Sequence, residues 1–312
     1  MKILVTYFIA LISSGYAQAD TFILPPSDVG VIGQLGFTGA NRQDTLLDIA
    51  REHDFGQNEI LLANPDVDRW LPADFSEVVL PNRFILPNVE RKGLVINLPE
   101  MRIYYFPEPE NGQVPVVITH PVSVGRMDWE TPLGKTTVIS KKIDPDWRPP
   151  QSLKDEAIEA GDEPLPDIVK AGPDNPLGRY AMRLGIPGYL IHSTNKPYGV
   201  GMRVTHGCLR MYPEDIERLF DQIPVGTPVR IINHPIKLGW LADSLFIELH
   251  PPLDEDREKY ENYMQNVLDT ISDFLAAQEG STDNDSSRAN LSGGALRQAI
   301  EEISGIPVRI SR

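Results

Sequence analysis

The chain has 312 residues, with 29 basic and 44 acidic side chains and a formal net charge of −15 at pH 7. Such an acidic surface argues against binding to nucleic acid or to anionic membrane surfaces. The length suggests two or three domains, and a hydrophobic content of 41% is enough for packed cores.

The first nineteen residues are predicted to be a secretory signal peptide. Lys2 gives a positive start, Ile3 to Ile12 form a short apolar run, and residues 17–19 read Ala-Gln-Ala, the small-x-small pattern of a cleavage site. The alternative is an N-terminal membrane helix, but the run is too short for a permanent anchor. We therefore expect an exported chain that starts at Asp20 and has no membrane span.

Residues 20–90 are predicted to form a small α+β module. Helical spacing of Leu46, Ile49 and Ala50 predicts a first helix over 44–53, which Gly56 can end. A second short helix is expected over 59–64, where Pro65 stops it. Short strands are expected over 78–80 and 83–86.

Residues 91–234 are predicted to form a mostly β domain. Strand candidates that alternate apolar residues with turn signals occupy 94–98, 102–106, 114–124, 136–140, 180–184, 189–192 and 229–232. Only one helix is expected among them, from Pro213 to Gln222. Residues 144–178 contain seven prolines and are expected to be a lid-like insertion; the alternative is a solvated insertion without a role.

Residues 235–312 are predicted to be an acidic, helical C-terminal region. Apolar residues recur at helical spacing from Tyr260 to Leu275, and Leu296, Ile300 and Ile303 mark a second short helix. A polar linker, 280–290, lies between them. This region is expected to pack on the other domains; the alternative is that its apolar stripe docks a partner.

The chain has one cysteine, Cys208, which cannot form an internal disulfide. In an exported protein a lone cysteine is an inert buried thiol, an intermolecular disulfide partner or a reactive group. It follows His206 and Gly207, and His192 lies sixteen residues upstream. This combination favours a nucleophile. No cysteine–histidine cluster has metal-site spacing, so no metal is expected.

The neighbouring residues suggest how the thiol is used. His192, at the end of a predicted strand, is the expected base, and Ser193 is the nearest group that could hold its second nitrogen. His206 is expected to orient the thiol or to help hold an oxyanion. The N–H groups of Gly207 and Cys208 could form an oxyanion hole.

Arg210 offers a guanidinium two residues after the nucleophile. It could bind a substrate carboxylate through two hydrogen bonds. The alternative is an ion pair with Glu214 or Asp215.

These residues resemble the signature of the YkuD family of L,D-transpeptidases: a histidine, a gap, then Ser/Thr-His-Gly-Cys followed by an apolar residue and Asn or Arg. Here the signature is His192, then Thr205 to Arg210, and the segments 131–134 and 171–178 also fit. The resemblance implies a YkuD-like β-sandwich and assigns Thr205 and Arg210 to substrate binding.

The N-terminal module resembles the LysM fold, which binds peptidoglycan. The matching residues are Asp44-Thr45-Leu46, Ile49-Ala50 and Leu62-Ala63-Asn64-Pro65, closed by Ile85-Leu86-Pro87. The family usually has a glycine before the Asp-Thr pair, where Gln43 stands here. The alternative is a structural β-α-α-β cap without affinity for glycan.

The order of segments resembles the Gram-negative periplasmic subgroup, which implies a mechanism without metal or cofactor. Cys208 attacks the carbonyl of diaminopimelate in a tetrapeptide stem, D-alanine leaves, and the thioester passes to an amine. That amine belongs to another diaminopimelate or to the C-terminal lysine of an outer-membrane lipoprotein. The resemblance also implies acylation of Cys208 by carbapenems.

Three alternatives stay open at this point. Water could resolve the acyl-enzyme, which would make the chain an L,D-carboxypeptidase or a lipoprotein-releasing hydrolase. The chain could be a peptidoglycan-binding protein with an idle catalytic domain. A thiol redox protein is disfavoured because a second cysteine is absent.

Overall fold

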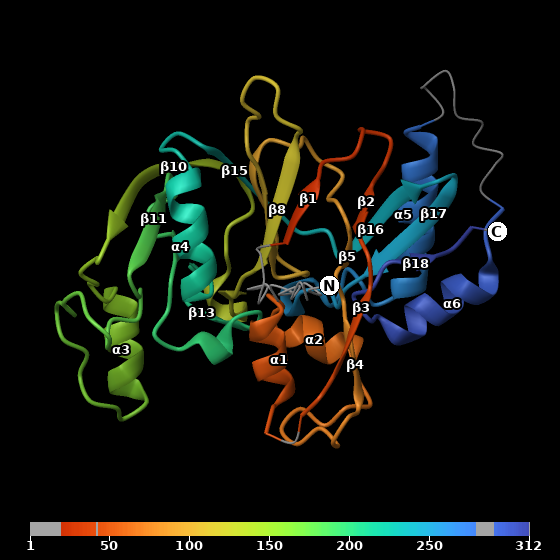
Figure 1. Ribbon diagram of the computed structural model, residues 1–312. Helices are drawn as coiled ribbons and strands as arrows, with labels where there is room; N and C mark the ends of the chain where they lie inside the picture. The colour runs from red at the N-terminus through yellow and green to blue at the C-terminus, as the bar shows by residue number, and fades with distance from the viewer. Residues whose placement is uncertain (1–19, 42, 279–289, 312) are drawn as a thin grey trace, which may run out of the picture.

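The computed structural model describes residues 20–41, 43–278 and 290–311 (Figure 1). The predicted signal peptide, residues 1–19, and most of the predicted linker lie outside the described residues. Among the residues that are described, no helix has the length and apolar content needed to cross a membrane.

The centre of the molecule is one large mixed sheet, which confirms the mostly β expectation. It curls, and its nine strands follow the order β1-β8-β7-β6-β15-β10-β11-β12-β14. Neighbouring strands are antiparallel except for the parallel pairs β6–β15 and β12–β14. In chain order these strands are β1 (Asp20–Ile23), β6 (Gly93–Asn97), β7 (Arg102–Phe106), β8 (Val116–Pro121), β10 (Gly134–Ile143), β11 (Tyr180–Leu184), β12 (Leu190–His192), β14 (Leu209–Arg210) and β15 (Pro228–Ile232). Two further short strands, β9 (Val124–Gly125) and β13 (Arg203–Thr205), pair in parallel beside it.

Both faces of the central strands are covered, so β6 is buried at all five positions. Leu94 and Ile96 belong to one apolar core, and Val95 between them belongs to another. Side chains that alternate between two buried faces produce a continuous apolar run, as the sequence has here.

Helix α4 (Pro213–Gln222) covers the first core, with the bounds that the sequence predicts. Ile216 and Leu219 on its apolar face are buried in that core. At its C-terminal end, the Lys141 ammonium donates to the carbonyl oxygens of Phe220 and Ile223. A cation at this end complements the helix dipole and satisfies carbonyl groups that lack a partner within the helix.

The N-terminal region contains the predicted order of strand, two helices and strand. Strand β3 (Gly36–Gly39) pairs antiparallel with β4 (Glu77–Leu80), and helices α1 (Leu46–Glu52) and α2 (Gln57–Ala63) lie between them in the chain. Thr45 and Asp48 form a capping box at the start of α1. The expected role of Gly56 was wrong: α1 ends at Glu52 with His53 as its C-cap, and Gly56 is the N-cap of α2.

The boundary expected near residue 90 does not separate two cores. Strand β1 is the edge strand of the large sheet, where it pairs with β8, and β2 (Val31–Gly33) pairs with β5 (Arg83–Ile85). The second core joins Leu46 and Ile60 of the N-terminal region to Tyr104 and Val117 of the sheet. Sequence composition did not reveal this shared core, because it joins side chains from segments that are far apart in the chain.

The expectation of a single helix in the β region was also wrong. Helix α3 (Gln151–Glu159) lies inside the insertion 144–178, on the side of the molecule opposite the C-terminal region (Figure 1). None of its residues is buried, so it has no apolar stripe that periodicity could reveal.

The C-terminal region is α+β, which corrects the expected all-helical region. Strands β16 (Ile236–Leu241), β17 (Ser244–Leu249) and β18 (Val308–Arg309) form a sheet, and α5 (Tyr263–Ala276) and α6 (Gly293–Glu302) pack on it. The two helices occur where the apolar spacing predicts them. Strand β16 is buried at its first four positions, and these include the charged Lys237, whose burial the sequence does not indicate.

Candidate active site

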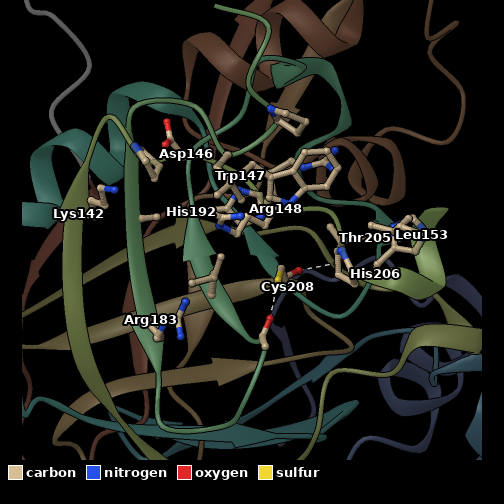
Figure 2. Close-up of a pocket in the computed structure, with 18 of the residues that line it drawn as sticks. Lys142, Asp146, Trp147, Arg148, Leu153, Arg183, His192, Thr205, His206 and Cys208 are labelled. Carbon is tan, nitrogen blue, oxygen red and sulfur yellow. Dashed lines mark hydrogen bonds between the residues drawn. The ribbon is translucent and has the colours of Figure 1, made fainter. Parts of the chain in front are cut away.

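A cavity of about 690 Å³ lies over the end of the large sheet formed by β10, β11, β12 and β14. The insertion 144–178 forms its other wall through Trp147, Arg148 and Leu153 (Figure 2). The base of the insertion is fixed by Asn175, whose buried side chain donates a 2.8 Å hydrogen bond to the carbonyl of Pro145.

The floor of the cavity consists of two rows of side chains that cross four strands. The strand register places Lys142 opposite Ala181, Ala181 opposite His192, and His192 opposite Arg210. The second row lies two residues further along each strand, where Ser140 is opposite Arg183 and Arg183 is opposite Leu190. Cys208, which immediately precedes β14, continues this second row. All eight residues line the cavity.

Alternate residues of the same strands face the other way. Met182, Ile191 and Leu209 pair across the strands and are buried in the first core. The alternation of the sequence on β12 and β14 therefore fixes which side chains reach the cavity, because successive side chains of a strand point to opposite faces.

Cys208 is a free, partly exposed cysteine on the cavity floor. Its sulfur lies 3.6 Å from the carbonyl oxygen of Gly188. Burial raises the pKa of the Cys208 thiol, although the N–H of Leu190 and the charge of Arg210 oppose this shift. At neutral pH the resting group is therefore a thiol, and it needs a base to become a nucleophile.

His192 lies diagonally across the β12–β14 pair from Cys208, and both face the same hollow (Figure 2). Burial and the nearby charge of Arg210 lower the pKa of His192 to about 4, while the bond to Ser193 opposes this. Its Nδ1 lies 2.5 Å from the carbonyl oxygen of Ser193. A carbonyl only accepts, so Nδ1 carries the proton and Nε2 of the neutral ring has a free lone pair.

The loop before the cysteine is held in a conformation that requires glycine at position 207. Gly207 has φ +90°, and a Cβ built there would lie 2.6 Å from the ring of Tyr189. Its carbonyl accepts a 2.9 Å hydrogen bond from Thr131. The hydroxyl of Thr205 donates to the carbonyl of Cys208 at 2.5 Å and so closes the turn that carries Cys208. Thr205, expected to bind substrate, also lines the cavity.

His206 reaches the insertion. Its Nε2 lies 2.9 Å from a carboxylate oxygen of Glu156 on α3, and the other oxygen of Glu156 pairs with Arg126. The rings of Trp129 and His206 pack in a T-shaped arrangement with their centroids 5.2 Å apart. The structure thus places His206 at the cavity wall with its Nε2 engaged by a carboxylate, whereas an oxyanion or thiol contact was expected.

Arg210 has neither of the carboxylate partners considered in the sequence. Glu214 pairs with Arg51 and Asp215 pairs with Arg218. Burial lowers the pKa of the Arg210 guanidinium, with Cys208 opposing this shift. No carboxylate of the described residues lies within ion-pair distance of Arg210, so this cation of the cavity floor is available to a ligand.

Sequence reasoning missed Glu156, Arg183 and Trp147, which also line or brace the cavity. Arg183 lies on a strand that the sequence predicts, but no pattern in the sequence shows which face of that strand lines the cavity. Glu156 could not be found from the sequence, since its contact with His206 spans fifty residues and depends on how the insertion folds back.

Two groups of side chains with the donor types of metal ligands lie outside the cavity. Asp54, His120 and Asp215 form one, in which His120 Nδ1 lies 2.8 Å from Asp54. In the other, made of Glu100, Glu248 and His250, the ammonium of Lys237 lies 2.7 Å and 2.6 Å from the two carboxylates and takes the place of a cation. Spacing in the sequence gave no sign of either group.

A thiol, a neutral imidazole with its free nitrogen and a cavity above both are the parts of a cysteine enzyme that works through a covalent acyl intermediate. Residues 91–231 match the family model of the L,D-transpeptidase catalytic domain, YkuD.

The similarity extends over almost the whole chain. The probable L,D-transpeptidase ErfK/SrfK of Escherichia coli is 38% identical over 97% of this chain and 95% of its own length. YbiS of the same organism is 38% identical over 95% and 93%, and YcfS is 34% identical over 95% and 90%. The chain therefore belongs to the YkuD family of L,D-transpeptidases, which are acyltransferases.

Proposed function

We propose that the cavity binds a tetrapeptide stem of peptidoglycan and transfers its acyl group from Cys208 to an amine. The observation that carries this proposal is that Cys208 and His192 line the same cavity, with His192 Nδ1 held by the Ser193 carbonyl so that Nε2 is left as the base. The family membership supports the same chemistry.

The chemical steps follow from these groups. His192 Nε2 takes the thiol proton as the sulfur bonds to the diaminopimelate carbonyl carbon, and the same proton then goes to the nitrogen of D-alanine as the C–N bond breaks. In the second half, an incoming amine attacks the thioester and gives a proton to His192. The S–C bond breaks, and the thiolate takes that proton back.

The developing oxyanion requires donors near the sulfur. The N–H groups of Gly207 and Cys208 have no acceptor among the described residues, and they lie in the turn that Thr131 and Thr205 brace. Unused N–H groups next to a nucleophile support the assignment of an oxyanion hole. Glu156 engages the Nε2 of His206, so in this proposal His206 positions the loop.

A direct test uses the purified protein with a tetrapeptide muropeptide, with and without a peptide that ends in the lipoprotein's C-terminal lysine, followed by mass spectrometry. A muropeptide joined to lysine, or a cross-linked dimer, would support the transferase and identify its acceptor. Release of D-alanine with only tripeptide formed would mean that water is the acceptor. An unmodified muropeptide would refute the proposal. The matched control is Cys208→Ala, which should neither react nor form a carbapenem adduct.

We further propose that the N-terminal module binds glycan and that the protein is exported to the periplasm. The order β3-α1-α2-β4 and the exposed Trp70 and Phe75 in the loop before β4 support a sugar-stacking surface. Trp70→Ala and Phe75→Ala should reduce cosedimentation with insoluble peptidoglycan, whereas Val225→Ala, an exposed site far along the chain, should not. Equal cosedimentation of all variants would refute glycan binding by this loop.

A further inference from the structure

Arg183 is a cation of the cavity that no part of the mechanism uses. It lies on β11, two strands away from the nucleophile in the row that ends at Cys208. Its side chain is exposed, and the described residues place no carboxylate within ion-pair distance of it. Figure 2 shows it on the same side of the sheet as His192 and Cys208.

The lack of a partner is informative because cations that do not line the cavity have one: Lys170 pairs with Asp146, Lys154 with Asp167, and Arg179 with Asp144. Among the described residues, no carboxylate lies within ion-pair distance of the four Lys and Arg side chains that do line it, Lys142, Arg148, Arg183 and Arg210. In a chain with a net charge of −15, carboxylates are plentiful. An arginine left without one inside a cavity is therefore arranged for an external anion.

A second cation stands on the neighbouring strand. Lys142 on β10 points to the same face and has Ala181 opposite it on β11. Because Ala181 is small, the floor between Lys142 and His192 is hollow. The two cations thus border one end of the cavity, and the cysteine and histidine border the other.

The strand spacing sets the length of a ligand that could reach both ends. Adjacent strands lie about 4.8 Å apart, so the backbone of Arg183 lies about 10 Å from that of Cys208. An extended peptide rises about 3.4 Å per residue. A carboxylate two or three residue lengths from the reacting carbonyl would therefore meet the guanidinium.

We propose that Arg183, assisted by Lys142, is a specificity-determining residue that binds a free carboxylate of the acyl-donor peptide. This inference rests on the proposed function, because it takes the ligand of the cavity to be a stem peptide. The guanidinium offers two parallel N–H donors to a carboxylate, and a neutral amide at the same place can accept only one of them well.

The test measures binding separately from turnover. In a Cys208→Ala background, the affinity for a tetrapeptide stem with free carboxylates is compared with that for the same stem carrying amides. Arg183→Gln should weaken binding of the free acid by about ten- to a hundred-fold and leave the amidated stem nearly unchanged. Arg183→Lys should restore part of the loss. Lys135→Gln, which removes one charge from β10 away from the cavity, should change neither affinity.

Equal losses for the acid and the amide would overturn the proposal, because they would indicate a general change of the cavity. An unchanged affinity for the acid, or no binding of the acid even with Arg183 present, would overturn it as well. The proposed function is judged by turnover of the protein with Cys208 intact. A protein that turns over the stem but does not distinguish acid from amide would keep the proposed function and lose this subsite.

Discussion

Buried, neutral His192 should make the stability of the protein fall as the solution is acidified. Its pKa is about 4 in the folded protein, against about 6.5 in an unfolded chain. Between these values the unfolded state binds a proton that the folded state does not, so the free energy of unfolding decreases as pH falls. Over about 2.5 pH units, at 1.36 kcal/mol per unit, the loss is about 3 kcal/mol. The contribution of neutral His192 to the free energy of unfolding is fully present above about pH 6.5 and fully lost below about pH 4.

The assay compares the protein with His192→Gln by urea unfolding, followed by tryptophan fluorescence, at steps from pH 7.5 to pH 4. Other titrating groups, including the buried Asp215, contribute to both proteins and cancel in the difference between the two curves. That difference should shrink by about 3 kcal/mol as the pH falls. Parallel curves would refute the assignment of His192 as a buried neutral base. A ring titration near pH 6.5 by NMR would do the same.

Three further changes test the loop, the insertion and the buried core. Gly207→Ala should cost about 1–2 kcal/mol of stability from its positive φ alone and reduce activity, because a Cβ collides with the tyrosine ring beside it; unchanged melting and turnover would contradict this. Glu156→Gln removes the carboxylate that engages His206, so it should increase proteolysis within 144–178 and lower kcat/KM. Asp155→Asn on the same helix should change neither. An equal response of both variants would argue against the contact with His206. Arg102→Met should lower the free energy of unfolding by about 3–5 kcal/mol because it leaves the largely buried Glu59 carboxylate unpaired. The double variant Arg102→Met, Glu59→Met should recover much of this loss. Thermal unfolding of both variants measures the two effects.

The sequence predicted the parts of this fold that depend on local pattern. Helix α4 has the predicted bounds because its proline, acidic first turn and apolar stripe all lie within ten residues. The strands β6 and β7, which pair as a hairpin, were predicted for the same reason: each is a short local pattern, and the two are contiguous in the chain.

What the sequence left open depends on contacts between distant segments. The pairing of β1 with β8 joins residues almost a hundred positions apart. The contact of Glu156 with His206 requires the insertion to fold over the loop, and no local pattern encodes that. Ser193 was identified as the group holding His192 because the two are adjacent, and its carbonyl lies beside Nδ1.

The shared core of the N-terminal region and the large sheet determines how this protein can be divided. Val95, Tyr104 and Val117 face that region and are nearly inaccessible to solvent. A fragment limited to residues 91–234 would turn these side chains outward and lose the edge strand β1. Such a fragment would associate with itself or fail to fold. The N-terminal module therefore cannot be exchanged as a separate cassette, and its surface can be altered only at side chains that do not face the shared core.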